Sequence, residues 1–312
     1  MGETKTASLR EALGEALVSL GGEKKDMVVV GADTTESMKT LEFGKKFPER
    51  FFNVGIAEQN MIGISAGLAL SGKTVFCGTY VVFLERAIDQ IRNTVAYCNL
   101  DVKIIGSHGG ISVGPDGGSH QAIEDLSIMR AIPRMVVLAP ADSYSTKALI
   151  RQAGMSKGPA YIRILRSATP MLYKGNEDIR IGKAEVLEGG SDLTIIANGI
   201  MVSEALRAAS MLKEKGISSE VIDCHTIKPI DTETIIRSAK KTGAVVTAED
   251  HNVFGGLGSA VAEVLSMGHP TRMAMVGVKD TFGESGDGPE LMKKYGLCSE
   301  NIFNEAIKLV KK

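Results

Sequence analysis

Short apolar runs alternate with segments of helical periodicity along most of this chain. A continuous apolar run bounded by charge or glycine is typical of a strand buried on both faces, and strands that alternate with helices are typical of a mostly parallel sheet. We therefore predict an open α/β fold with right-handed crossovers. The predicted strands of the first half are 27–32, 74–79, 101–106, 135–139 and 160–164, and the predicted helices are 8–20, 57–70, 83–97, 121–131 and 143–153.

The length of the chain and a polar, glycine-rich stretch near its middle together predict two domains. A chain of 312 residues exceeds the usual size of one core, since domains cluster near about 100 to 150 residues. We place a first α/β domain at 1–172, a polar and glycine-rich linker at 173–191, and a smaller α/β domain at 192–312. The predicted strands of the smaller domain are 193–197, 219–223, 244–249 and 272–277, and its predicted helices are 201–215, 231–240 and 258–266.

Composition excludes several classes of protein. A net charge of -1 gives no electrostatic reason to expect nucleic acid or an anionic membrane as partner. The four cysteines are too scattered for a zinc site or a disulfide framework, which favours a reducing, cytoplasmic location. The N-terminus lacks an apolar stretch of signal-peptide length, and no later run approaches the roughly 18 residues of a spanning helix. We expect an unprocessed, soluble protein.

Glu58 begins a predicted helix just after a loop. Loops of this kind matter because ligands of open α/β sheets bind at the carboxyl ends of the strands. On position alone, Glu58 is a first-turn carboxylate that complements the helix dipole. Its neighbours Val54, Ile56 and Met61 are apolar, however, and burying an unpaired carboxylate among them is costly. We therefore expect Glu58 to have a partner.

Two further pairs of side chains follow predicted strands. Tyr80 and Phe83 are three residues apart, a spacing that puts both rings on one face of a helix. Such aromatic pairs are more often core than ligand contacts, although the loop position favours a ligand. Arg163 and Arg166 close the strand at 160–164, where a guanidinium suits a phosphate or carboxylate; a surface ion pair is the alternative.

The stretch 107–124 is rich in glycine and holds His108 and His120, two of the five histidines. Together with Asp116, these imidazoles on a mobile loop suit hydrogen bonding to hydroxyl groups and proton transfer near neutral pH. A surface loop with incidental histidines is the alternative. The spacing lacks the helical histidine pair and the cysteines typical of zinc sites, so we predict no metal site in this chain.

Taken together and in this order, these stretches resemble the C-terminal half of transketolase, a thiamine diphosphate enzyme. The resemblance covers essentially the whole chain and implies a pyrimidine-binding domain followed by a transketolase C-terminal domain. Val-Gly-Ile-Ala-Glu-Gln-Asn-Met at 54–61 is similar to the family's Gly-Ile-x-Glu-His/Gln segment. This implies that Glu58 is catalytic and pairs with the cofactor's aminopyrimidine ring, on which Tyr80 and Phe83 pack. Arg86 stands at the family's third aromatic position.

The glycine-rich loop resembles that of transketolase in its first histidine, its Gly-Pro-Asp-Gly turn at 114–117 and its Ser-His-Gln at 119–121. The resemblance implies that Asp116 and His120 contact the sugar, that His108 lies toward its phosphate end, and that both histidines assist proton movements. Ser37 and Arg166 match phosphate-binding residues of the family. Another phosphate-binding arginine of the family falls at Ala7.

The resemblance also implies a partner. Gly-Asp-Gly at 286–288 imitates the start of the family's diphosphate motif, but the required asparagine cannot follow so near the end. We interpret this triplet as a C-terminal loop. An N-terminal transketolase subunit would then supply the diphosphate-binding domain and hold Mg²⁺ or Ca²⁺ with the cofactor, in an expected α2β2 heterotetramer.

The implied activity is transfer of a two-carbon ketol unit between sugar phosphates, as in the pentose phosphate pathway. Two alternatives stay open. A 1-deoxy-D-xylulose-5-phosphate synthase shares the Ala-Glu-Gln variant and a Gly-x-Asp-Gly-x-x-His loop, but generally lacks a histidine at the position of His108. A non-catalytic regulatory subunit with the same fold is the other.

Overall fold

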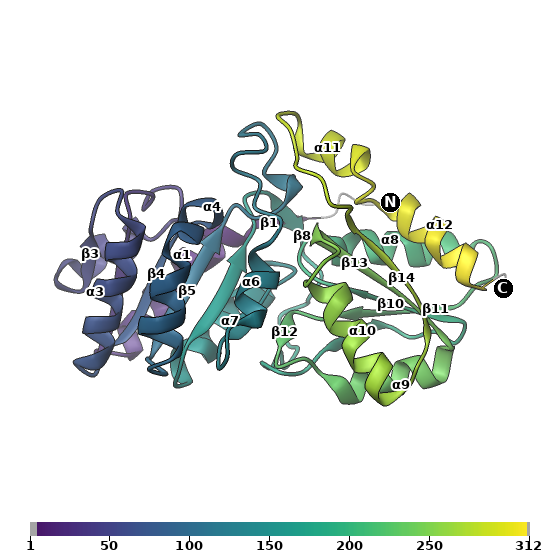
Figure 1. Cartoon of the computed structure of the whole chain (residues 1–312), viewed down its shortest axis with the longest axis horizontal. Helices are drawn as coiled ribbons and strands as arrows, with labels where there is room; N and C mark the ends of the chain where they lie inside the picture. Colours follow the sequence, from purple (N-terminus) through teal and green to yellow (C-terminus); the bar gives the residue numbers. More distant parts are fainter. Residues whose placement is uncertain (1–4, 311–312) are drawn as a thin grey trace. The chain divides into compact units, whose positions relative to one another are not determined.

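The computed structural model describes residues 5–310, which divide into two compact units (Figure 1). The first unit comprises the chain up to Gly109 together with Met129–Ile181, and the second comprises Gly110–Ile128 together with the chain from Gly182 onward. The break after Ile181 falls inside the expected linker at 173–191. The segment Gly110–Ile128, which lies inside the predicted domain at 1–172, is grouped with the second unit, and Asp250 and Asn252 of that unit hydrogen-bond to it.

A mostly buried parallel sheet forms the centre of the first unit. Its strands in this unit lie in the order β6-β7-β5-β4-β2-β3. The central strands are continuous apolar runs that are buried on both faces, as a parallel sheet covered by helices requires. The strands are β2 (Met27–Gly31), β3 (Phe51–Asn53), β4 (Thr74–Tyr80), β5 (Val102–Ser107), β6 (Val136–Leu138) and β7 (Ala160–Ile164).

Helices cover both faces of this sheet (Figure 1). On one face α1 (Leu9–Glu23) packs against α2 (Leu41–Lys46) and α7 (Ser143–Met155). Right-handed crossovers place α3 (Glu58–Leu70) and the segment after β4 on the other face. The predicted helix at 83–97 is broken there into α4 (Val81–Leu84), α5 (Ile88–Gln90) and short 3₁₀ and π turns, and α6 spans Asp125–Ala131. A small antiparallel ribbon pairs β1 (Thr6–Ser8) with β8 (Ala168–Pro170).

The predicted helix at 8–20 extends further in the structure, through the glycine pair at 21 and 22. The helix continues through Glu23, because Gly21 serves close packing: a Cβ atom there would lie 2.5 Å from the ring of Phe43 in α2. At its other end, the Ser8 hydroxyl accepts a hydrogen bond from the Glu11 amide and caps the first turn.

The second unit contains a smaller sheet with the strand order β14-β13-β10-β11-β9. Its strands are parallel except for β9, which is antiparallel to β11. Strand β9 lies inside the expected linker and was not predicted, because glutamates stand at both of its ends. Helices α8 and α12 pack together, as do α9 and α10. The elements are β9 (Glu185–Glu188), β10 (Leu193–Ala197), α8 (Met201–Lys213), β11 (Ser219–Asp223), β12 (Thr226–Lys228), α9 (Thr232–Thr242), β13 (Ala244–Asn252), α10 (Leu257–Gly268), β14 (Arg272–Val278), α11 (Gly288–Lys294) and α12 (Ser299–Val310).

Within residues 5–310, no helix combines the length and the apolar character needed to cross a membrane.

All four cysteines are free thiols, and burial raises the pKa of the Cys77 thiol to about 12. A buried thiol of this kind is a poor nucleophile, because the thiolate is the reactive form. Cys77 therefore acts as a small apolar side chain of the core.

Burial of His225 makes the stability of the second unit sensitive to acid. His225 follows β11, and desolvation lowers its pKa from 6.5 to about 4. The folded state keeps the ring neutral while the unfolded state binds a proton below pH 6.5, so stability present above that pH is lost as the pH falls toward 4. We expect this one group to remove about 3 kcal/mol of unfolding free energy over that range.

The measurement is urea unfolding followed by circular dichroism at about pH 7 and about pH 4.5. A His225→Gln variant should lose clearly less stability between these two pH values than the unsubstituted chain. Equal losses in the two proteins would contradict the assignment to His225.

Candidate functional site

Most of the residues predicted for the site lie at one edge of the first unit's sheet. Because β3, β2, β4, β5 and β7 are parallel, their carboxyl ends meet at the same edge, where open α/β sheets bind ligands. The residues at or just after the ends of these strands include Glu58, Ser37, Tyr80 with Phe83, His108 and Arg166. The topology thus gathers residues that are far apart in the sequence.

Glu58 is the first residue of α3 and is only 7% exposed. Within residues 5–310, its carboxyl group has no hydrogen-bond or ion-pair partner. The preceding residue, Ala57, offers no side-chain cap to the helix either. A carboxylate so little hydrated is costly to leave unpaired. The partner expected from the sequence is therefore not another side chain in this part of the molecule.

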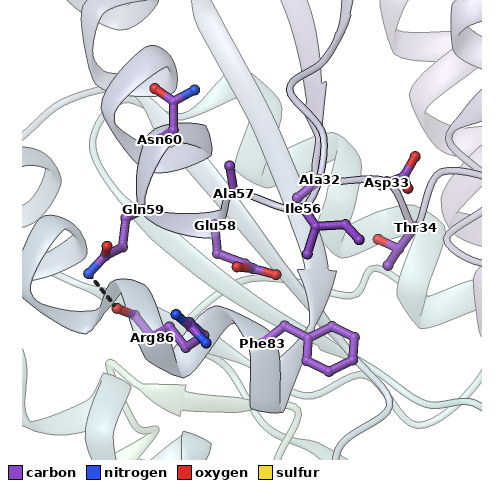
Figure 2. Close-up of a pocket in the computed structure, with 10 residues that line it drawn as sticks. All are labelled: Ala32, Asp33, Thr34, Ile56, Ala57, Glu58, Gln59, Asn60, Phe83 and Arg86. Carbon is purple, nitrogen blue, oxygen red and sulfur yellow. Dashed lines mark hydrogen bonds between the residues drawn. The ribbon is translucent and has the colours of Figure 1, made fainter.

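A cavity of about 640 Å³ opens at Glu58. Figure 2 shows its carboxyl group directed toward the space between Ile56 and Phe83. On the other side of Glu58, the Gln59 side-chain amide donates a 3.1 Å hydrogen bond to the carbonyl of Arg86. This volume suits a small ring system. The lining residues are Ala32, Asp33, Thr34, Ile56, Ala57, Glu58, Gln59, Asn60, Phe83 and Arg86.

Tyr80 makes stacking contacts with two other rings of the predicted site. The centroids of Tyr80 and Phe83 are 5.3 Å apart with an interplanar angle of 11°, and those of Tyr80 and His108 are 3.8 Å apart at 20°. Nearly parallel aromatic pairs are favourable beyond their area of contact. Tyr80 ends β4 instead of lying in a helix, yet its ring meets Phe83 as the spacing of three predicts.

His108 is 2% exposed and not on a mobile loop, which differs from the expectation. It lies directly after β5, its backbone amide donates to the carbonyl of Ile164, and its Nδ1 is 2.8 Å from the Ser107 hydroxyl. Its φ of 61° is in the left-handed region, which is costly outside glycine. The surrounding contacts hold the ring in one orientation against Tyr80.

Ser37 is contacted by a residue that the sequence analysis missed. Arg10, in the first turn of α1, donates from Nη1 to the Ser37 carbonyl at 3.1 Å and to its hydroxyl at 3.3 Å. The Ser37 hydroxyl is also 2.7 Å from the Tyr80 hydroxyl. Arg10 lies three residues after Ala7, which is in strand β1. Sequence alone gives no signal that links Arg10 to Ser37.

The two arginines of β7 and its loop differ in exposure. Arg163 lies within β7 and is buried, and a Cβ atom on Gly109 would lie 2.4 Å from its Nε. Arg166 follows the strand and is half-buried. Only Arg166 is therefore positioned beyond the strand end, as the predicted phosphate contact requires.

Asp116 and His120 belong to the second unit. Asp116 is exposed, and His120 is half-buried with its Nδ1 3.0 Å from the Ser119 hydroxyl. The start of their loop is anchored by Asp250 in β13, whose two carboxylate oxygens accept hydrogen bonds from the amides of Ile111 and Ser112 at 2.8 and 3.2 Å. Asp250 thus positions this loop, a role that no sequence motif indicated.

The loop is also joined to the segment 280–288. The Gln121 side-chain amide donates to the carbonyls of Ile111, Gly114 and Glu284 at 3.4, 3.1 and 3.0 Å. The Ser285 hydroxyl donates to the carbonyl of Pro115 at 2.6 Å. The turn that carries Asp116 is therefore held from both sides.

Nothing in the described part of the chain indicates a metal site. Within residues 5–310 there is no cluster of three or more histidine, cysteine, aspartate or glutamate side chains arranged to hold an ion. Gly-Asp-Gly at 286–288 is the loop that begins α11, where the Asp287 carboxylate accepts a hydrogen bond from the Glu290 amide. Asp287 is a helix cap.

Two family models match the chain in the order of its units: the transketolase pyrimidine-binding domain over residues 5–171 and the transketolase C-terminal domain over residues 182–302. The chain belongs to the transketolase family. The resemblance inferred from the motifs, and the mixed α/β fold with mostly parallel sheets, are thereby confirmed.

Several transketolase relatives match over nearly their whole length. A putative transketolase C-terminal section from Methanocaldococcus jannaschii is 50% identical over 97% of this chain and 96% of its own length. A 6-deoxy-6-sulfo-D-fructose transketolase subunit from Clostridium sp. is 44% identical over 96% of this chain and 93% of its own. A solved split gene transketolase, described as an inactive β4 tetramer, is 48% identical with a TM-score of 0.92, covering 97% of this chain and 98% of its own.

Membership of the transketolase family implies the use of thiamine diphosphate. The residues at the Glu58 cavity fit the pyrimidine end of this cofactor, because a buried carboxyl group without a partner lies beside Phe83, which stacks on Tyr80. Arg86 also lines the cavity, at the position where the resemblance implied a third aromatic ring.

Proposed function

We propose that this chain is the C-terminal subunit of a split transketolase, which transfers a two-carbon ketol unit from a ketose phosphate to an aldose phosphate. Thiamine diphosphate would be held between this chain and a diphosphate-binding partner subunit, which would also bind Mg²⁺, in an α2β2 assembly. The observation that carries the proposal is Glu58: a buried carboxyl group that faces a cavity and has no partner within residues 5–310.

The cofactor, when bound, supplies the nucleophilic carbon for cleaving and forming carbon–carbon bonds. The residues of this chain position it and handle protons. Glu58 would hold a proton at its carboxyl group for a ring nitrogen, and Tyr80 and Phe83 would pack on the pyrimidine ring. Because Tyr80 is also stacked on His108, it would join the pyrimidine-binding part of the cavity to a residue proposed to bind the sugar.

The remaining roles concern the sugar. His108 and His120 move protons and position hydroxyl groups, Asp116 accepts hydrogen bonds from a hydroxyl, and Ser37 and Arg166 bind the terminal phosphate. The substrate class has a second candidate, because the relative from Clostridium is named for a sulfonated sugar. A sulfonate, like a phosphate, presents oxygen atoms that a guanidinium can bind.

The experiment is to mix the chain with a diphosphate-binding transketolase subunit, thiamine diphosphate and Mg²⁺, and to follow ketol transfer from a ketose phosphate to an aldose phosphate. We expect transfer in the mixture and none by either subunit alone. A solved relative described as an inactive β4 tetramer supports the second expectation.

Two outcomes would favour the alternatives. Condensation of pyruvate with an aldose phosphate, without ketol transfer, would indicate an enzyme of the deoxyxylulose phosphate synthase type. A complex that forms but fails to bind thiamine diphosphate would indicate a regulatory subunit.

A further inference from the structure

A small cleft of about 150 Å³ lies in the first unit, away from the Glu58 cavity. It is formed by the end of the helical segment that precedes β5 and by the turn between α6 and β6. Because β5, β7 and β6 are parallel, residues just before β5 and β6 lie at the amino edge of the sheet, opposite the carboxyl edge at which Glu58 lies. The lining residues are Arg92, Ala96, Tyr97, Ile132, Pro133 and Arg134.

Buried apolar side chains and an exposed aromatic ring line this cleft together. Ala96 and Ile132 are 2% and 6% exposed, whereas Tyr97 is 78% exposed. The Arg134 Nη1 donates to the Tyr97 carbonyl at 2.9 Å, which joins the two segments that form the cleft. Arg134 also has a φ of 66°, a backbone conformation that is costly for a large side chain and is found mainly where function requires it. The cleft is therefore formed before any ligand binds.

Two arginines give the cleft a positive charge. Arg92 and Arg134 are exposed, and neither forms an ion pair with a carboxylate of residues 5–310. Arg92 instead donates to the side-chain oxygen of Asn93 at 2.6 Å, while the nearby Asp89 carboxylate accepts hydrogen bonds from the side-chain amides of Asn93 and Gln90. Guanidinium groups bind carboxylates through paired hydrogen bonds. The charge of the cleft therefore fits an acidic ligand.

The size of the cleft indicates what kind of acidic ligand it fits. Pockets that hold whole small molecules have volumes of about 300 to 1,000 Å³, so this cleft suits a single apolar side chain. Its six residues are also far fewer than the roughly 20 to 30 that each partner contributes to a stable interface between two globular chains. Tyrosine and arginine, which are both present here, are enriched where one side chain of a partner supplies most of the binding energy. A short segment of polypeptide meets all of these conditions.

We infer that the cleft binds a short acidic segment of another protein, in which one apolar side chain stands between carboxylates. The apolar side chain enters the cleft against Tyr97 and Ile132, and the flanking carboxylates pair with Arg92 and Arg134. The inference goes beyond the proposed function and does not depend on it. Because the cleft lies at the amino edge of the sheet, the segment would tether its protein to this chain without entering the Glu58 cavity.

The test is a titration of a fluorescein-labelled peptide, Gly-Gly-Asp-Glu-Phe-Glu-Asp-amide, with the full chain, followed by fluorescence anisotropy. We expect binding that weakens as the salt concentration rises. A peptide with serine in place of phenylalanine, and one with lysines in place of the four acidic residues, should each bind roughly tenfold more weakly or not at all.

Variants of the chain assign the binding to the cleft. Tyr97→Ala should weaken it roughly tenfold, and Arg92→Gln about 3- to 5-fold, as expected for an exposed ion pair. Both side chains are exposed, so the variants should keep the circular dichroism spectrum of the unsubstituted chain. Arg151→Gln is the matched control, because Arg151 is an exposed arginine of the same unit that pairs with Glu23, and it should bind the peptide normally.

Three results would overturn the inference. The first is equal binding of the phenylalanine and serine peptides, and the second is binding to Tyr97→Ala and Arg92→Gln that is as tight as to the control. The third is absence of binding at about 1 mM peptide. Self-association of the chain that is lost in Tyr97→Ala, measured by analytical ultracentrifugation and found without peptide binding, would assign the cleft to a second copy of this chain and would also overturn the inference.

Discussion

Replacing Glu58 with glutamine is expected to reduce ketol transfer by the assembled enzyme about a thousandfold, the middle of the range for positioned acid–base groups. Glutamine has nearly the same shape and can still make hydrogen bonds, but it cannot hold and release a proton. Because Glu58 has no partner within residues 5–310, no folded-state contact is lost with its charge. We therefore expect the unfolding free energy of the isolated chain to stay the same or to rise slightly.

The measurements are steady-state ketol transfer and urea unfolding of the same variant. Glu49→Gln, which makes the same change at an exposed carboxylate of the first unit outside the cavity lining, is the matched control and should lose far less activity. A Glu58→Gln assembly that retained more than about a tenth of the activity would contradict an acid–base role.

Replacing Gly110 with alanine is expected to release the loop that carries Asp116 and His120. Gly110 has a φ of 87°, and a Cβ atom there would lie 2.2 Å from a carboxylate oxygen of Asp250. That carboxylate accepts the amides of Ile111 and Ser112, so the substitution adds backbone strain and displaces the loop's anchor. Together these effects should cost about 3 kcal/mol.

Hydrogen exchange at the Ile111 and Ser112 amides measures this directly, since the free energy of opening should fall by that amount. KM for the sugar should rise in the same variant. Gly189→Ala is the control in the same unit, because no atom lies within 4 Å of its added methyl group. Amides that stay protected in Gly110→Ala would show that Asp250 does not anchor the loop.

The sequence predicted the strands best where one physical signal dominates. Residues 160–164, 193–197 and 219–223 match β7, β10 and β11 without error, and every residue in them is buried. The edge strands β3 and β9 escaped prediction because they are short, partly exposed and carry polar residues, so neither burial nor periodicity distinguishes them from loops.

The residues of the site also differ in whether the sequence could predict them. Glu58, Tyr80 and Phe83 were predicted because local apolar and aromatic neighbours set them apart, and their roles remain predictions. Arg10 and Asp250 were missed because their importance comes from contacts with Ser37 and with the Ile111 amide, which are distant in sequence. Such pairings depend on how helix and strand ends align in space, and one sequence does not encode that alignment locally.

The attachment of residues 110–128 to the second unit limits how these proteins can be recombined. Gln121 and Ser285 tie the turn at 114–117 to the segment 280–288. A chimera that exchanged only residues 182–312 between two family members would combine the loop at 110–128 of one protein with the segment 280–288 of the other. An exchange that also moved residues 110–128 would keep this loop and the segment 280–288 from the same parent. Crossover points chosen only from the linear order of the domains should therefore yield fewer working hybrids.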